Sequence, residues 1–154
     1  MNSDIRMVEV ATGHVSNRHQ AILLENLNDY IFKKEDRTET YHSWYLFDEQ
    51  LGQHIKKFEM SLPKNIKIAS LIGRYYSMDR DNRWERVKKA FDLIVYGKYD
   101  RKFSNISEGL EEAYKNNETD EFISPTLIGN YKGFEDGDSL IMVNFRADRV
   151  RELL

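Results

Sequence analysis

Apolar residues in this chain form short strand-like blocks that alternate with longer segments in which apolar residues recur every three or four positions. The strand-like blocks lie, in chain order, at residues 7–11, 41–47, 66–72, 122–128 and 139–144. The helical period predicts helices at residues 16–34, 51–62, 82–96 and 107–116, and the start of another at 147. Strands that alternate with helices are typical of an α/β fold.

We therefore predict an α/β domain of three layers, in which helices flank a mostly parallel or mixed sheet. The chain has 154 residues, 40% of them hydrophobic, which suffices for one continuous core but not for two. A single domain over residues 1–154 is the expected organisation. The nearly continuous apolar block 139–144 predicts a strand buried on both faces. Pro125 marks block 122–128 as an edge strand or as the entry to a strand.

Charge and composition narrow the classes of partner. The formal net charge is −3. Proteins that bind a nucleic-acid polymer do so through a broad basic surface, so this charge argues against such a partner. The absence of cysteine excludes disulfides and thiolate metal sites. The longest apolar runs fall well short of the ~18 residues that span a bilayer, and no signal peptide is recognisable. We expect a soluble cytoplasmic protein that binds neither nucleic acid nor membranes.

Two arginine clusters directly follow two of the predicted strands. Arg74 and Arg80 come after the third strand, and Arg146 and Arg149 come after the last. Ligands of open α/β sheets usually bind where the carboxyl ends of strands meet, and arginine forks bind phosphate oxygens bidentately. The clusters therefore predict a phosphate-binding site. The alternative is that these arginines are solvated or paired with the acidic residues beside them.

Other chemistry receives little support. His14 and His19 are five positions apart, which is not the spacing that places two metal ligands on one helix face. No nucleophile and base pair, nucleophile elbow or phosphate loop is present. We expect no metal and no cofactor. His14 is a candidate donor to an anion, and Tyr75 is a candidate to stack on a ligand.

The chain also resembles a known family in its second half. The run Gly73-Arg74-Tyr75-Tyr76-Ser77-Met78-Asp79-Arg80-Asp81-Asn82-Arg83-Trp84-Glu85-Arg86 resembles the cofactor-independent (2,3-bisphosphoglycerate-independent) phosphoglycerate mutases. So do Thr119-Asp120-Glu121-Phe122 with Pro125, and Asp136-Gly137-Asp138-Ser139 leading to Asn144-Phe145-Arg146-Ala147-Asp148-Arg149. The resemblance covers residues 66–154 and implies that Arg74, Arg80, Arg146 and Arg149 grip a phosphoglycerate in a phosphotransferase-like domain.

The first half departs from that family. Gly13-His14-Val15-Ser16-Asn17-Arg18 stands where the family has Gly-Gly-Val-His-Ser-His, so that Ser16 occupies the position of a histidine. Asp48 is the one remnant of an acid–arginine pair. No part of the chain resembles the family's metal-binding domain, which carries a serine nucleophile and two manganese sites. With His14 and Tyr75, the further candidate ligand contacts are thus Ser16, Asp48 and Asp148.

Three interpretations of function follow. The favoured one is a non-catalytic module that binds or sequesters a phosphorylated small molecule, either a metabolite or a signalling nucleotide. The second is a fragment or split half of a phosphoglycerate mutase, with a separate chain supplying metal and serine. The third is a protein-interaction module that reuses the fold, with a second copy or another protein as partner. Catalysis by the chain alone is not expected.

Overall fold

The computed structural model describes residues 7–12, 40–46, 55, 59–60, 62, 66–143 and 147–154. Within this part of the chain a six-stranded sheet has the order β4-β5-β3-β2-β1-β6. Its strands are β1 (Met7–Thr12), β2 (Thr40–Leu46), β3 (Ile66–Gly73), β4 (Arg101–Phe103), β5 (Thr126–Ile128) and β6 (Ser139–Val143). The helices are α3 (Arg74–Ser77), α4 (Trp84–Tyr96) and α5 (Ile106–Lys115), with 3-10 helices η1 (Asp120–Phe122) and η2 (Ala147–Arg149).

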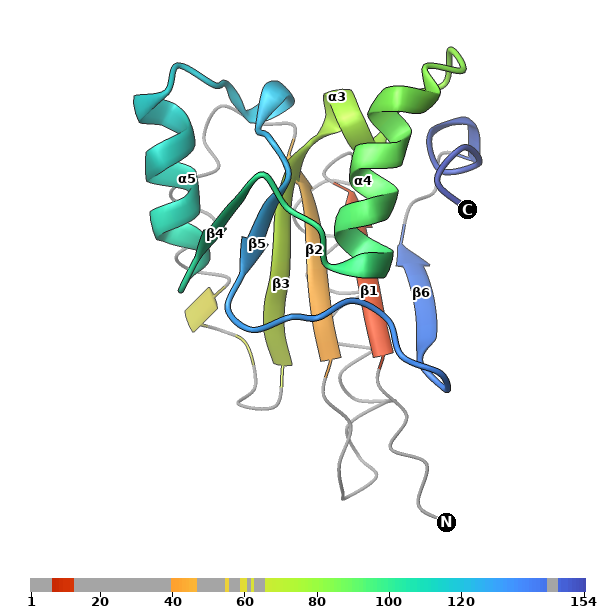
Figure 1. Cartoon of the computed structure of the whole chain (residues 1–154), viewed down its shortest axis with the longest axis horizontal. Coiled ribbons are helices and arrows are strands. Elements are labelled where there is room, and N and C mark those ends of the chain that lie inside the picture. The colour runs from red at the N-terminus through yellow and green to blue at the C-terminus, as the bar shows by residue number, and fades with distance from the viewer. Residues whose placement is uncertain are drawn as a thin grey trace.

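The sheet is mixed and mostly parallel, as predicted. Strand β1 pairs in parallel with both β2 and β6, and β2 pairs in parallel with β3. Strand β5 runs antiparallel to β3 and parallel to β4. Figure 1 shows the parallel strands rising side by side, with α4 in front of them and α5 beside β4.

Helices α4 and α5 cover opposite faces of the sheet, which gives the three predicted layers. Ala69 and Ile72 of β3 pack in the core under α4, whereas Ile68 and Leu71 pack in the core with α5. This pattern departs from simple alternation because the pairing of β2 with β3 shifts beside Ala69. A bulge adds one residue to the strand and resets which face each later side chain occupies.

The most regular patterns in the sequence predicted their elements well. The structure confirms strands over the first three apolar blocks and helices close to the predicted 82–96 and 107–116. Helix α4 ends at Tyr96, as predicted, with Gly97 as its C-cap, and it buries Val87, Ala90, Leu93 and Ile94. Trp84, the first residue of α4, is 55% exposed.

Of three further predictions about elements, one was right in one of its two forms and two were wrong. Residues 122–128 do not form an edge strand, because β5 lies between β4 and β3, but Pro125 does stand at the entry to a strand, directly before β5. Strand β6 is not buried on both faces: it is one of the two edge strands of the described sheet, and Leu140 is 40% exposed. The segment from Ala147 forms a 3-10 turn followed by further turns rather than an α-helix.

The predicted helix 16–34 lies outside the described residues, and so does most of the predicted helix 51–62. Of the few described residues in the range 51–62, Ile55 is buried in the core beside α5. In the part of the chain that the structure describes, none of the helices has the length and apolar character needed to cross a membrane.

Candidate functional site

The carboxyl ends of β3 and β6 lie at the same edge of the sheet, because both strands run parallel to β1 and β2, which separate them. Figure 1 shows α3 at the end of β3 and the C-terminal segment beyond β6 at that edge. Two segments meet here, which we name loop 78–83 and terminal segment 147–154. The edge is the place where open α/β sheets usually bind ligands.

Loop 78–83 and terminal segment 147–154 are joined through the predicted arginines. The guanidinium of Arg80 lies 3.3 Å from Oδ2 of Asp148, and both side chains are roughly half exposed (49% and 44%). Arg149 donates from Nη1 to the backbone carbonyl of Met78 at 2.8 Å. The structure therefore brings Arg80, Asp148 and Arg149 together, and their roles as ligand contacts stay predictions.

A third contact fixes the far end of the loop. The backbone N–H of Asn82 donates to Oε1 of Glu152 at 3.1 Å. Asn82 has a φ of 58°, a left-handed conformation that asparagine tolerates better than most residues. Arg83 occupies the N-cap position of α4 and makes no side-chain cap hydrogen bond.

Asp79 lies in loop 78–83 and was not among the site residues predicted from the sequence. Its carboxylate is buried, and Oδ2 accepts hydrogen bonds from the backbone N–H groups of Asp81 and Arg83, both at 3.0 Å. Burial raises the pKa of Asp79, but the two N–H bonds and the charges of Arg83 and Arg86 outweigh burial and hold that pKa below its ordinary value. The sequence could have indicated this contact, because aspartate side chains often accept a hydrogen bond from the backbone N–H two residues further on.

Arg74 occupies the first position of α3, directly after β3. Its Nε lies 3.9 Å from Oε1 of Glu121 in η1, and its side chain is only 18% exposed. Gly73 allows this approach, because a Cβ there would lie 2.2 Å from the carbonyl oxygen of Glu121. Arg74 thus reaches the same edge from the side of η1. The short helix α3, which begins with Arg74 and leads into loop 78–83, was not predicted.

Tyr75 is held within the protein by other rings and by a cation. The guanidinium carbon of Arg86 lies 3.9 Å from the centre of its ring. The rings of Tyr76 and Phe122 each lie 5.1 Å away. These contacts are those of a packed side chain, and stacking of Tyr75 on a ligand stays a prediction.

Four candidate residues fall outside the described part of the chain, namely Arg146, His14, Ser16 and Asp48. Among the described residues, no cluster of three or more histidine, cysteine, aspartate or glutamate side chains is arranged to hold a metal ion. The described cations at the edge are guanidinium groups, and those of Arg74 and Arg80 lie near the carboxylates of Glu121 and Asp148. Guanidinium groups suit an anionic ligand.

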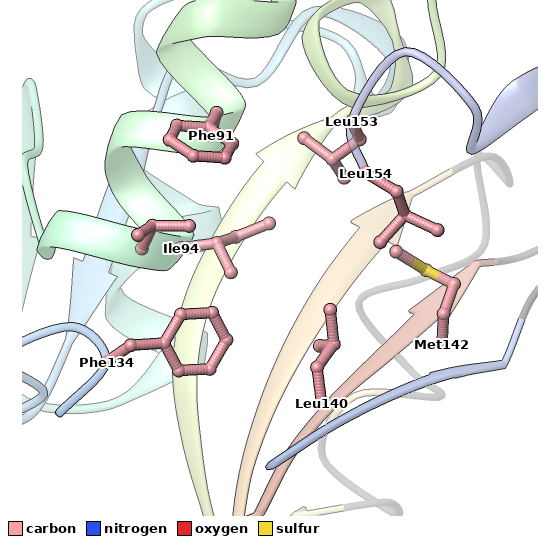
Figure 2. Close-up of a pocket in the computed structure, with 8 residues that line it drawn as sticks. Phe91, Ile94, Phe134, Leu140, Met142, Leu153 and Leu154 are labelled. Atoms are coloured by element: carbon pink, nitrogen blue, oxygen red, sulfur yellow. The ribbon is translucent and has the colours of Figure 1, made fainter. Parts of the chain in front are cut away.

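An apolar pocket of about 210 Å³ lies between α4, β6 and the terminal segment. Figure 2 shows Phe91 and Ile94 of α4 across from Leu153 and Leu154, with Met142 and Leu140 of β6 closing the side. Its lining side chains are all apolar: Phe91, Ile94, Val95, Phe134, Leu140, Met142, Leu153 and Leu154. Such a pocket offers no charged partner to a phosphate, so the candidate anion site is the arginine cluster.

Comparison with known proteins bears on the same region. Residues 47–154 match the family model described as the BPG-independent PGAM N-terminus. The 2,3-bisphosphoglycerate-independent phosphoglycerate mutase of Agrobacterium fabrum is 54% identical over 94 residues, which cover 61% of this chain and 18% of that enzyme. The enzyme of Pseudomonas fluorescens is 58% identical over 87 residues, covering 56% of this chain and 17% of the relative.

The mutase of Psychrobacter arcticus is 50% identical over 109 residues, or 68% of this chain and 20% of that enzyme. The chain thus spans about a fifth of the length of the curated relatives it matches. The match includes both segments that meet at the candidate site. The chain belongs to the family of the N-terminal region of 2,3-bisphosphoglycerate-independent phosphoglycerate mutases.

Proposed function

We propose that this chain is the substrate-binding part of a 2,3-bisphosphoglycerate-independent phosphoglycerate mutase, and that it holds a phosphoglycerate through Arg74, Arg80, Arg146 and Arg149. The observation that carries the proposal is the contact between loop 78–83 and terminal segment 147–154. In that contact Arg80 pairs with Asp148, 68 positions away, and Arg149 donates to Met78, 71 positions away, inside the region that matches the family.

The chemistry of these side chains fits a phosphate monoester. Each guanidinium offers a planar set of donors, and a charge-assisted hydrogen bond contributes roughly 1.5–3 kcal/mol. Arg80 is half exposed and its partner Asp148 is similarly exposed. Exposed ion pairs of this kind contribute little, so a doubly charged phosphate replaces Asp148 as the partner of Arg80 at small cost.

The family match favours a mutase part over the alternative of a free-standing module that sequesters a phosphorylated metabolite or nucleotide. Both proposals share the binding step and a cytoplasmic setting, and they differ in whether turnover follows. In the mutase, the metal and the serine nucleophile come from sequence that the relatives carry outside the matched fifth. Phosphorylated small molecules are the proposed ligands in either case.

Binding is tested by isothermal titration of the chain with 3-phosphoglycerate, with glycerate as the ligand that lacks the phosphate. We expect heat of binding for the first ligand only. Arg80→Ala is expected to weaken it, whereas Arg151→Ala removes an exposed arginine from the same segment as Arg149 and is the matched control. Equal affinity for glycerate, or equal effects of the two variants, contradicts a phosphate site at Arg80. A panel of phosphorylated nucleotides in the same assay tests the signalling ligand.

Turnover is tested by a graft. The matching segment of the Pseudomonas fluorescens mutase is replaced by the corresponding residues of this chain, which are 58% identical to it. A working substrate-binding part keeps mutase activity in the graft, and Arg80→Ala within the graft removes it. A graft that folds, as judged by circular dichroism, and binds 3-phosphoglycerate without turnover favours the sequestering module instead.

A further inference from the structure

The two carboxylate oxygens of Asp79 serve two different sets of groups. Oδ2 accepts both backbone hydrogen bonds, from Asp81 and Arg83. Oδ1 faces two guanidinium groups, with Arg83 Nη1 at 3.6 Å and Arg86 Nη1 at 3.9 Å. The Asp79 side chain is only 5% exposed, whereas the side chains of Arg83 and Arg86 are partly exposed. One buried carboxylate therefore ties the backbone of the loop to two cations.

These contacts connect the loop to the start of α4 and to α3. The N–H group of Arg83 belongs to the N-cap residue of α4, where a negative charge is favoured by the helix dipole. Arg86 lies in the first turns of α4 and also stacks on Tyr75, the neighbour of Arg74 in α3. Asp79 thus holds loop 78–83 against α3, whose last residue precedes the loop, and against α4, which begins directly after it.

Arg80 follows Asp79 directly, and its guanidinium meets the terminal segment at Asp148. We propose that Asp79 is a positioning residue, whose buried carboxylate fixes the loop conformation that presents Arg80 to the anion site. This inference rests on the proposed function. It also assigns Arg83 and Arg86 to holding the loop, and so separates them from the arginines that contact the ligand.

Asparagine at this position isolates the charge. Its amide oxygen can replace Oδ2 and keep both backbone bonds, but its NH2 group then faces the two guanidinium groups, donor against donor. Asp79→Asn therefore keeps the shape of the side chain and disturbs the two arginines. Asp81→Asn is the matched control, because Asp81 is an exposed neighbour that pairs with Arg83 at 3.2 Å.

The test is a double-mutant cycle on binding of 3-phosphoglycerate. We expect Asp79→Asn to weaken binding about tenfold, a change typical of coupling between neighbouring residues, and Asp81→Asn to change it by less than about twofold. In an Arg80→Ala background the effect of Asp79→Asn should disappear, because the residue that it positions is gone. A loss that is equally large in both backgrounds overturns the inference, since it indicates a general structural role.

Two further outcomes are decisive. Where wild-type protein binds 3-phosphoglycerate and Asp79→Asn binds equally well, the inference fails while the proposed function stands. Where the wild type does not bind, the proposed function fails, and amide hydrogen exchange at Asp81 and Arg83 in Asp79→Ala, which lacks the acceptor of both N–H groups, decides whether Asp79 holds the loop: exchange as slow as in the wild type overturns the inference. Should Asp79→Asn not fold, the double variant Asp79→Asn with Arg86→Met removes one stranded cation and takes its place in the cycle.

Discussion

Arginines near the carboxyl edge of this sheet and elsewhere in the fold differ in how firmly the protein holds them. Arg80 and Asp148 form a half-exposed pair at 3.3 Å. Arg101 and Glu118 are only about a fifth exposed, and Glu118 also accepts from both the N–H and the hydroxyl of Ser124. Exposed pairs exchange partners at little cost, whereas a shielded network loses much when one member leaves. Arg80 is therefore suited to a ligand, and Arg101 to holding β4.

At the proposed anion site, we expect alanine at Arg74, Arg80, Arg146 or Arg149 to weaken 3-phosphoglycerate binding by about 1.5–3 kcal/mol, roughly ten- to a hundredfold. Lysine should restore only part of the loss, because a point charge does not reproduce the planar fork. Titration calorimetry measures both effects. Full recovery with lysine at every position would mean that net charge alone attracts the ligand.

The lowered pKa of Asp79 predicts a pH dependence of stability. A carboxyl group whose native pKa lies below the unfolded value of 3.8 stabilises the fold above that pH, and this contribution is lost as the pH falls through the native pKa. The difference in unfolding free energy between wild type and Asp79→Asn should therefore shrink on acidification. Urea unfolding from about pH 6 to about pH 2.5 measures it. A difference that stays constant over this range contradicts the prediction.

At the scale of elements, the connection from β5 to β6 is packed tightly against the end of α4. The N–H of Phe134 donates to the carbonyl of Val95 at 2.9 Å. A Cβ at the neighbouring Gly133 would lie 2.5 Å from the same carbonyl oxygen. The connection and the last turn of α4 therefore behave as one packed unit.

Two glycines allow the cost of lost packing to be measured separately from the cost of backbone strain. Gly133 and Gly137 have almost the same φ, +92° and +96°, but a Cβ at Gly137 meets nothing within 4 Å. Gly137→Ala should cost about 1 kcal/mol of unfolding free energy from the backbone alone. Gly133→Ala should cost about 3 kcal/mol, since α4 and the connection must also separate. Equal costs in urea unfolding would show that the close approach relaxes freely.

Elements with a long sequence pattern were easier to predict than elements with a short one. Helix α4 shows a clear apolar period over 13 residues, and β3 is a run of eight residues that is buried almost throughout, so both were recognised. Strand β4 has only three residues, Arg101–Phe103, and reads as part of a polar loop. Its existence depends on pairing with β5, which begins only at Thr126, and no local pattern reports that.

The candidate site also has a part that could be predicted from the sequence and a part that could not. Arg80 and Arg149 were expected to converge because each follows a parallel strand, and that expectation needs only the order of elements. The hydrogen bonds of Asp79 depend on the left-handed residue Asn82 and on the local turns of loop 78–83, which the sequence pattern does not specify. Long-range placement was therefore easier to predict than the local geometry that orients each side chain.

At the scale of the whole molecule, the chain covers only about a fifth of the length of the phosphoglycerate mutases that it matches. We expect the purified chain of 154 residues to show no phosphoglycerate mutase turnover, with or without manganese. A coupled enzymatic assay with the Pseudomonas fluorescens enzyme as positive control measures this. Turnover that Arg74→Ala abolishes would overturn the prediction.

The contact between loop 78–83 and terminal segment 147–154 closes a stretch of 70 residues between Asn82 and Glu152. Closing a flexible chain of that length costs several kcal/mol of chain entropy, and the cost depends only weakly on the exact length. We expect an anion bound by arginines on both sides to act as a reversible cross-link across this closure. Because β4, α5, β5 and β6 all lie between the two ends, binding of such an anion should stabilise these four elements together.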